Sequence, residues 1–248
     1  MENYLVFRLY GPMASWGEIA IGEVRRSASY PSRSAILGLV SAALGIKRSN
    51  SEKLALLFDG YDVAVRVDST GVLLRDYHTV QVPDSTGKYQ YATRRDELIM
   101  GKDRLGTMLT SREYRCDALC IVALRERNKP PYSLVVINDK LLKPEFVLYL
   151  GRKSCPLALP ILPQCINAGG FREALDSAKF PPIIARSNDE DATGRYLPLL
   201  PATRYYWENE AGDMKPQMSH ERYDDPLNRT RWQFGPRTEN MMTAGGES

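Results

Sequence analysis

The feature that most constrains the fold is an apolar helix that follows a buried strand near the start of the chain. Residues 4–10 are almost all apolar and end at the breaker Gly11, which predicts a strand. Ser32 or Ser34 can cap the helix and Gly45 can close it, with a wide apolar face between them. A strand and a helix of this kind predict a domain in which helices cover a sheet.

The rest of the chain continues with short strand and helix patterns. Residues 61–67 alternate between apolar and polar types, as in a half-buried strand. The further predicted elements are strands at 72–80 and 117–124, an apolar run at 133–137 with a short helix after it, a helix at 171–179, and strands at 181–185 and 196–200. This order suits an α+β fold of the ferredoxin or RNA-recognition type.

A long polar segment, residues 81–111, interrupts this order. It contains three glycines and several Lys and Arg side chains but no pattern of core residues. A connection of this length without secondary structure usually has a function or is disordered. We therefore expect a projecting excursion or a mobile loop here, and a ragged end to the chain at 241–248.

The composition excludes several classes of protein. With 248 residues, 43% hydrophobic and 25% charged, the chain can bury a sizeable core. Its longest apolar stretch, 35–46, is shorter than the ~20 residues of a membrane span, and the N-terminus shows no secretory signal. We therefore expect a cytoplasmic protein that does not contact a membrane. The net charge of +3, concentrated in the N-terminal two thirds, permits a polyanionic partner without requiring one.

Residues that carry metal or covalent chemistry are sparse. None of the Walker, GxGxxG, HExxH, GxSxG or CxxC motifs occurs. Cys116 and Cys120 are closely spaced, but with two histidines a zinc site would need almost every such residue to converge. Cys155 has no base beside it in the sequence, which disfavours a cysteine nucleophile. Buried structural thiols are the simpler interpretation, and no cofactor is predicted.

His78 is the sharpest catalytic candidate. It follows Arg75, Asp76 and Tyr77, and it could act as a general acid or base beside a cation, as metal-free RNA cleavage requires. Asp76 would share its face of a strand, so a structural pair of Asp76 and His78 is the alternative. The second histidine, His220, lies in a loose acidic stretch and is expected to be exposed to solvent.

A basic turn around Gly151 indicates a nucleic-acid partner. Tyr149, Arg152, Lys153 and Ser154 place a ring, two cations and a hydroxyl close together. Cations bind phosphates and rings stack on unpaired bases, so this combination suits a single strand with a splayed base. An ordinary surface turn is the alternative.

Other cations have two interpretations each. Arg33 lies in the first turn of the predicted helix, where backbone N–H groups and a guanidinium can bind an anion, although a surface arginine is equally possible. Residues 229–237 mix cations and aromatics, and a C-terminal strand that closes the sheet explains them equally well. The excursion and its flank mix tyrosines and acids with further cations, as a solvated loop also would: Arg94, Arg95, Lys102, Arg104 and Arg112.

Five blocks of the sequence, taken in order, resemble a known family. They are residues 11–17, 30–46, 74–80, 111–117 and 142–156. Together they resemble the CasD-type subunits of the type I-E CRISPR surveillance complex, Cascade, within the RAMP superfamily. Residues 157–248 match this family more loosely.

The resemblance implies a single RAMP-type domain over residues 1–248. Its fold would be a modified ferredoxin-like, RNA-recognition palm with a protruding β-hairpin thumb at about 81–111, and a looser part at 157–248. Such a subunit is a non-catalytic RNA binder that holds the repeat-derived 5′ handle of the CRISPR RNA and caps one end of the complex. Its other implied partners are the backbone subunit, the large subunit and, through the complex, target DNA.

The resemblance and the residue types together give a set of expected RNA-binding residues. These are Trp16, Arg33, Ser34, Arg75, His78, Arg104, Arg112, Tyr149, Gly151, Arg152, Lys153 and Ser154. Two rival functions stay open. One is a metal-independent endoribonuclease that processes CRISPR repeat RNA with His78 as its acid or base, and the other is a protein-interaction module that uses the excursion for docking.

Overall fold

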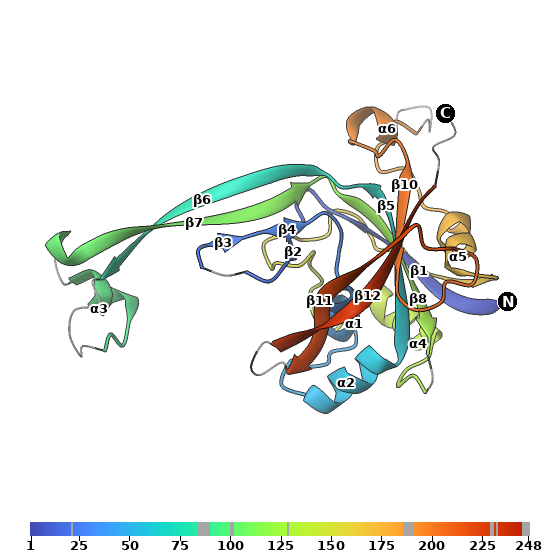
Figure 1. The fold of residues 1–248 in the computed structure, drawn as a ribbon, viewed down its shortest axis with the longest axis horizontal. Helices are drawn as coiled ribbons and strands as arrows, with labels where there is room; N and C mark the ends of the chain where they lie inside the picture. Colours follow the sequence, from blue (N-terminus) through green and yellow to red (C-terminus); the bar gives the residue numbers. More distant parts are fainter. Residues whose placement is uncertain are drawn as a thin grey trace.

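The body of the molecule is built on one seven-stranded sheet (Figure 1). The computed structural model describes residues 1–248 apart from 21, 84–89, 100–101, 128, 186–190, 229–230, 232 and 245–248. All neighbouring strands of this sheet are antiparallel. Their order across the sheet is β11 (Met218–Asn228), β12 (Gln233–Ala244), β10 (Thr203–Trp207), β5 (Tyr61–Ser69), β8 (Leu119–Glu126), β1 (Glu2–Tyr10) and β9 (Gln164–Ala168).

Helices cover both faces of this sheet, which gives a mixed α+β architecture. The helices are α1 (Arg33–Ala43), α2 (Ser51–Asp59), α4 (Leu134–Leu142) and α5 (Phe171–Ser177). The first three share a core with Phe7, Val65 and Val122, and α5 packs on the opposite face around Tyr4 and Trp207. β5 is therefore buried on both faces rather than half-buried, because each face of the sheet has its own core. No helix among the described residues is long and apolar enough to cross a membrane.

Serine caps determine where two of these helices begin. The Ser32 Oγ accepts a hydrogen bond from the Ala35 N–H at 3.1 Å, and Gly45 beyond α1 has a φ of +72°, which confirms both predicted ends of this helix. Ser133 caps α4 by accepting a hydrogen bond from the Val136 N–H at 3.4 Å. The apolar run predicted to precede a helix is thus the first turn of the helix itself.

A long two-stranded arm projects from the body (Figure 1). Its strands, β6 (Val72–Pro83) and β7 (Leu105–Cys116), pair antiparallel along their whole length, and α3 (Arg94–Ile99) and a 3₁₀ turn (Lys102–Arg104) lie at its tip. The expected excursion at 81–111 is therefore only the outer part of a longer hairpin. Part of that excursion, residues 84–89 and 100–101, lies outside the described residues. This outer part of the hairpin lacks a core pattern because it projects away from the body (Figure 1), and side chains such as Leu109 are exposed.

Three short strands connect the start of the arm to the body. β2 (Trp16–Gly17) pairs with β4 (Ser27–Ala28), and β3 (Val24–Arg25) runs parallel to β7. The chain between Ala14 and Ala28 therefore lies along the root of the arm.

The C-terminal third differs most from the prediction. The strand expected at 181–185 contributes only an isolated bridge between Ala185 and Asp191. The strand predicted at 196–200 is wrong, because Tyr196 ends the short helix α6 (Thr193–Tyr196) and residues 197–200 form no strand. The sequence patterns missed β9, β10 and β11. A C-terminal strand that extends the sheet is confirmed from Gln233 onward. The end expected to be ragged at 241–248 belongs to β12 as far as Ala244, and its last four residues lie outside the described chain.

Candidate nucleic-acid interface

Three segments that are distant in sequence meet at the root of the arm. Ala14 and Arg115 exchange two backbone hydrogen bonds of 2.8 and 2.7 Å, which join the segment after β1 to β7. The Ser15 N–H donates to the Leu150 carbonyl at 3.0 Å, which joins the same segment to the basic turn at 149–156. We call this place, formed by the described residues of 14–28 together with 111–116 and 149–156, the arm root.

The basic turn is held in one conformation. The Leu150 N–H donates to the Cys155 carbonyl at 2.7 Å, and the Cys155 N–H donates to the Arg152 carbonyl at 2.9 Å. Gly151 has a φ of +83°, and a Cβ placed there would lie 1.9 Å from the Ser15 carbonyl oxygen. Only glycine fits this approach, so the glycine predicted to shape the turn also sets how closely it docks.

The turn presents two cations at the arm root. The Arg152 guanidinium lies over the Tyr114 ring, 5.0 Å from its centre, and its Nη1 is buried without a hydrogen-bond partner among the described residues. Lys153 and Ser154 beside it are exposed, and the Tyr149 side chain is 42% exposed. A buried donor without an acceptor is costly, and a phosphate or other anionic oxygen would satisfy it.

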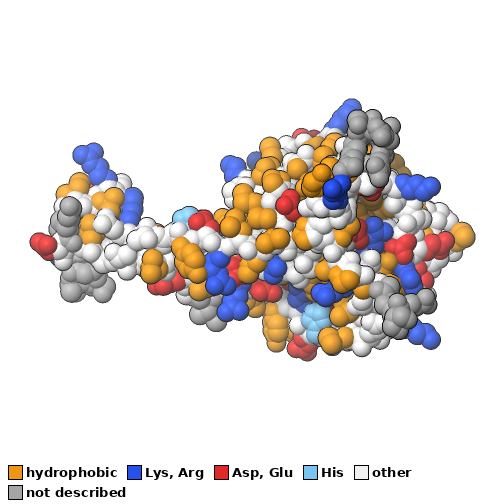
Figure 2. All heavy atoms as spheres, turned by 90° about the horizontal axis from the view of Figure 1, so that it is seen from above, with side chains coloured by type: hydrophobic (Ala, Val, Ile, Leu, Met, Phe, Trp, Pro, Cys, Tyr) orange, Lys and Arg blue, Asp and Glu red, His pale blue; other side chains and the backbone are white. Residues whose placement is uncertain are grey.

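Three further arginines belong to the arm root, and sequence analysis assigned none of them to the site. Arg25 and Arg26 are exposed in and beside β3, while Arg115 points inward and donates to the Ala28 and Ser27 carbonyls. The adjacent pair Arg25–Arg26 after a loop was the available signal. Figure 2 shows Lys and Arg side chains, with Asp and Glu side chains among them, where the arm meets the body.

Two more of the predicted residues lie at the start of the arm. Arg112 is exposed on β7 in register with Arg25. The Arg75 Nη2 donates to Glu113 Oε1 at 2.8 Å, and the Ser27 N–H donates to Glu113 Oε2 at 3.3 Å. Although burial acts to raise the pKa of Glu113, these hydrogen bonds lower it overall. Glu113 therefore stays ionised and holds Arg75 against the root.

Trp16 is present at the root but does not offer a stacking face. Its side chain is buried, with the six-membered part of the indole 3.6 Å from the position of a Cβ on Gly151. The indole Nε1 has no hydrogen-bond partner among the residues described. A ring that is 3% exposed cannot stack on a base without moving. Trp16 instead packs against the basic turn and supports it.

His78 and Arg104 lie farther out along the arm. The His78 Nε2 is 2.7 Å from Asp76 Oδ2, which confirms the predicted pair on one face of a strand. Thr110 is its cross-strand partner in the hairpin. Arg104 immediately precedes β7 at the far end of the arm, so the structure does not bring it to the root.

Arg33 and Ser34 have partners within the protein instead. The Arg33 Nε donates to Glu208 Oε1 at 2.7 Å, and its backbone N–H donates to Asp224 Oδ2 at 2.8 Å. The two hydroxyls of Ser32 and Ser34 lie 3.0 Å apart. With its guanidinium and backbone N–H both occupied, Arg33 does not present the predicted anion site, and the interface proposed below does not include it.

Arg33 is part of a buried ionic cluster under β11 and β12, which we call the ionic clamp. It consists of Arg33, Arg222 and Arg237 with Glu208, Asp224 and Glu239, and all six are mostly buried. Burial acts to raise the pKa of Glu239, but Arg222 and Arg237 outweigh it, and the pKa lies below its usual value. The clamp joins the C-terminal hairpin to the start of α1.

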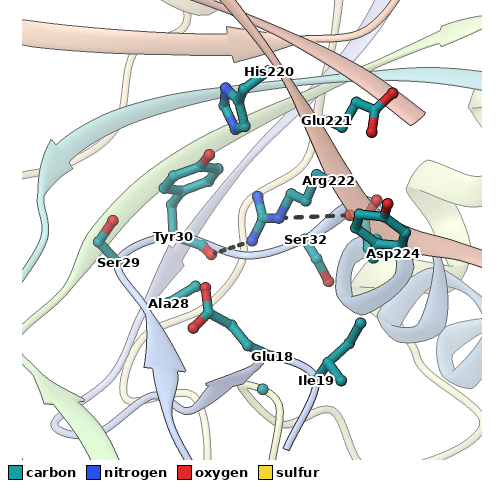
Figure 3. Close-up of a pocket in the computed structure, with 12 residues that line it drawn as sticks. Glu18, Ile19, Ala28, Ser29, Tyr30, Ser32, His220, Glu221, Arg222 and Asp224 are labelled. Atoms are coloured by element: carbon teal, nitrogen blue, oxygen red, sulfur yellow. Dashed lines mark hydrogen bonds and ion pairs between the residues drawn. The ribbon is translucent and has the colours of Figure 1, made fainter. Parts of the chain in front are cut away.

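A pocket of about 380 Å³ opens beside the clamp, between residues 17–32 and β11 (Figure 3). Tyr30 forms part of its wall and is sandwiched: its ring stacks on Tyr206 at 3.7 Å, and the Arg222 guanidinium lies 4.4 Å from its centre. His220 also lines the pocket, on a strand and not in a loose stretch, and is 40% exposed with its Nε2 3.4 Å from Glu239. Its expected exposure is confirmed.

The cysteines do not form a metal centre in the described part of the chain. Cys116 ends β7 and Cys120 lies in β8, so the pair is divided between two strands. All four cysteines are free thiols, and burial raises the pKa of Cys155. Cys120 and Cys155 are buried as predicted, whereas Cys165 is exposed and Cys116 is only partly buried. No group of three His, Cys, Asp or Glu side chains that could hold a metal ion occurs among the described residues.

The chain is similar to proteins of CRISPR systems. Residues 4–239 match the model of the family described as CRISPR-associated protein (Cas5). The chain is 35% identical over 211 residues to the CRISPR system Cascade subunit CasD of Escherichia coli strain K12, which covers 79% of this chain and 86% of that protein.

Two solved structures have a similar fold. One is from a CRISPR RNA-guided surveillance complex, with a TM-score of 0.63 and 26% identity over 97% of this chain and 90% of that one. The other is a crystal structure of a Cas protein, with a TM-score of 0.62 and 24% identity over 98% and 96% of the two chains, and it supports the fold alone.

Proposed function

This chain belongs to the CRISPR-associated Cas5 protein family, and we propose that it is a non-catalytic RNA-binding subunit of a CRISPR surveillance complex. In this proposal it holds the repeat-derived 5′ handle of the CRISPR RNA at the arm root. The relative named CasD is a Cascade subunit, and a similar solved chain comes from an RNA-guided surveillance complex, which supports this role.

The observation that carries the proposal is the convergence of cations at the arm root. Arg25, Arg26, Arg112, Arg152 and Lys153 come from three segments that only the fold brings together. Most of them are exposed, and Arg152 carries a buried Nη1 that lacks an acceptor in the described part of the chain. Single-stranded RNA supplies phosphate oxygens for such donors and unstacked bases for an exposed ring such as Tyr149.

The order of the helices and strands supports the interpretation of the body as a palm and of the arm as a thumb. The elements β1, α1, β5, β8, α4 and β9 follow one another in the strand–helix–strand–strand–helix–strand order of ferredoxin-like units, and their strands are neighbours in the sheet. We take this unit as the palm of a single RAMP-type domain and β6–β7 as the thumb. The remaining strands β10, β11 and β12 extend the palm beyond β5.

The arm also offers surface for protein partners. It exposes apolar side chains along its length, including Val72, Leu73, Tyr77 and Leu109. Solvent-facing apolar residues on a narrow two-stranded arm fit contacts with neighbouring subunits. We propose that these partners are the backbone subunit and the large subunit, that the chain caps one end of the complex, and that it reaches target DNA only through the assembled complex.

The rival endoribonuclease function rests on His78. The pair of His78 and Asp76 is exposed on the arm, on the same face as Arg112. A histidine held by a carboxylate near a cation could move protons in metal-independent cleavage. The pair is equally explained as a surface ion pair, and nothing else in the described residues completes an active site around it.

One experiment tests both functions. Labelled CRISPR repeat RNA is incubated with the purified chain in excess EDTA, and a native gel measures binding while a denaturing gel measures cleavage. We expect a shift with intact RNA, and Arg152→Ala with Lys153→Ala should weaken it. The matched control removes two exposed cations elsewhere, Arg195→Ala with Lys215→Ala, and should bind as the wild type does. A discrete cut would contradict the proposal and support the nuclease.

A further inference from the structure

The pocket beside the ionic clamp has the size of a small-ligand site. Its lining comes from two separate parts of the chain, one with Gly17 to Ile19 and residues between Ala28 and Ser32, the other with His220 to Asp224 (Figure 3). Its volume of about 380 Å³ lies in the range of small-ligand sites. The exposed side chains of Ile19 and Tyr223 stand at its edge and offer apolar contact.

One wall of the pocket is a fixed hydrogen-bond donor. The Arg222 guanidinium is stacked on Tyr30, its Nη1 donates to Glu239 at 3.2 Å, and its Nη2 donates to the Tyr30 carbonyl at 3.3 Å. A guanidinium has five N–H donors, so these bonds among the described residues leave an Nη2 hydrogen for a ligand. Figure 3 shows this guanidinium directed into the pocket. The stack on Tyr30 and the hydrogen bond to Glu239 fix the position of the Arg222 guanidinium before a ligand binds.

The opposite wall is an acceptor. Glu18 lies across the pocket from Arg222, and its carboxylate points toward the interior in Figure 3. The side chain is exposed, and within the described chain no hydrogen bond or ion pair holds it. The pocket therefore presents a donor on one side and an acceptor on the other.

From these two walls we infer that the pocket takes one unstacked, amino-bearing nucleobase of the bound RNA. Cytosine, adenine and guanine each carry an amino donor and an acceptor on one edge, and carboxylates accept from the cytosine amino group. Uracil has a carbonyl at both ends of its pairing edge, so one of them would face the Glu18 carboxylate. A stacked guanidinium such as that of Arg222 is also a platform for a base.

A basic side chain of a protein partner fits the pocket less well. The guanidinium of a partner's arginine could reach Glu18, but the positive charge of Arg222 would repel it. It also has no acceptor for the Arg222 N–H groups. The inference rests on the proposed function, because RNA is the source of the base. It goes further in naming which base type binds and which side chains select it.

The test uses nucleosides, which carry no phosphate and so do not depend on the phosphate-binding cations proposed for the arm root. The full chain is labelled with ¹⁵N and titrated separately with cytidine, adenosine, uridine and N-acetyl-arginine amide. We expect cytidine and adenosine to shift the backbone amides of Gly17, Ser29 and His220 to saturation, and uridine to bind several-fold more weakly. Glu18→Ala should weaken cytidine binding about tenfold, the loss of one hydrogen bond to a charged group. The control Glu210→Ala, an exposed glutamate outside the pocket, should not.

The other outcomes overturn the inference. Equal binding of uridine, unchanged cytidine binding by Glu18→Ala, or shifts with the arginine amide alone would each contradict it, the last in favour of a protein side chain. If repeat RNA gives a gel shift but no nucleoside causes a response, the inference about the pocket is wrong and the proposed function is unaffected. Cytidine binding in a chain that does not shift RNA would support the pocket and contradict the proposed function.

Discussion

The arm root and the ionic clamp are both rich in arginine, yet they use it in opposite ways. At the arm root, Arg26 and Arg112 are exposed, and Arg152 has a buried donor for which the residues that the structure describes supply no acceptor. In the clamp, Arg33 and Arg237 are buried and their guanidinium groups are bound by carboxylates. The two sites differ in the position of their Asp and Glu side chains, which lie directly beside the guanidinium groups in the clamp. Arginines that are exposed or that keep an unsatisfied donor are therefore candidates for RNA phosphates, whereas Arg33 and Arg237 are already bound to buried carboxylates within the described chain.

The strongest way to test this comparison is to break the clamp. Arg237→Ala removes the cation between Asp224 and Glu239 and leaves both carboxylates buried. We expect the free energy of unfolding to fall by about 3–5 kcal/mol, because an uncompensated buried charge is costly. Urea denaturation measures this loss. Arg195→Ala, an exposed arginine, should change stability by less than about 0.5 kcal/mol. A loss below about 1 kcal/mol in Arg237→Ala would show that the clamp is not structural.

The second test acts on the backbone of the arm root. Gly151→Ala places a Cβ 1.9 Å from the Ser15 carbonyl at a positive φ, so the turn must move. We expect a loss of about 1–3 kcal/mol of stability and weaker RNA binding, because Arg152 and Lys153 move with the turn. Gly38→Ala is the matched control, since a Cβ at Gly38 meets nothing within 4 Å. RNA affinity that stays at the wild-type value in Gly151→Ala would separate the turn from the RNA site.

A third test addresses the arginines that the sequence patterns did not identify. Arg25→Ala with Arg26→Ala removes two exposed cations from the arm root. Each lost phosphate contact should reduce the slope of log K against log salt by about 0.7 for a single strand, so the expected change is about 1.4. Titration at several salt concentrations measures it. An unchanged slope would place the RNA elsewhere on the molecule.

The smallest effect is expected at His78. His78→Ala breaks an exposed pair with Asp76, which is worth about 1 kcal/mol or less. RNA incubated with the variant and with the wild type should remain equally intact on a denaturing gel. RNA that the wild type cuts and the variant does not would identify His78 as a catalytic residue and reverse the proposed function.

Local patterns predicted the parts of the molecule that local contacts determine. The capped helix at 33–43, the turn at Gly151 and the pair of Asp76 and His78 each depend on residues close in sequence. Each was recognisable because caps, positive-φ glycines and strand periodicity act over a few residues.

The parts that the patterns missed depend on distant partners. Arg33 was a candidate anion site because it lies in the first turn of the helix, but its partner Glu208 is 175 positions away and could not be identified from the local pattern. The strands β11 and β12 carry many charged residues, which is typical of solvated segments, but several of these charges are buried in the clamp. The convergence of Arg25, Arg112 and Arg152 could not be predicted without the fold.

The most direct measurement of the central claim is a photochemical crosslink between the chain and repeat RNA that carries 4-thiouridine in its 5′ handle. Mass spectrometry then identifies the crosslinked peptides. The account predicts crosslinks within residues 14–28, 111–116 or 149–156, and their loss when Arg152 and Lys153 are replaced by alanine. Crosslinks confined to the opposite face of the sheet, around α5, would contradict the assignment of the RNA site to the arm root.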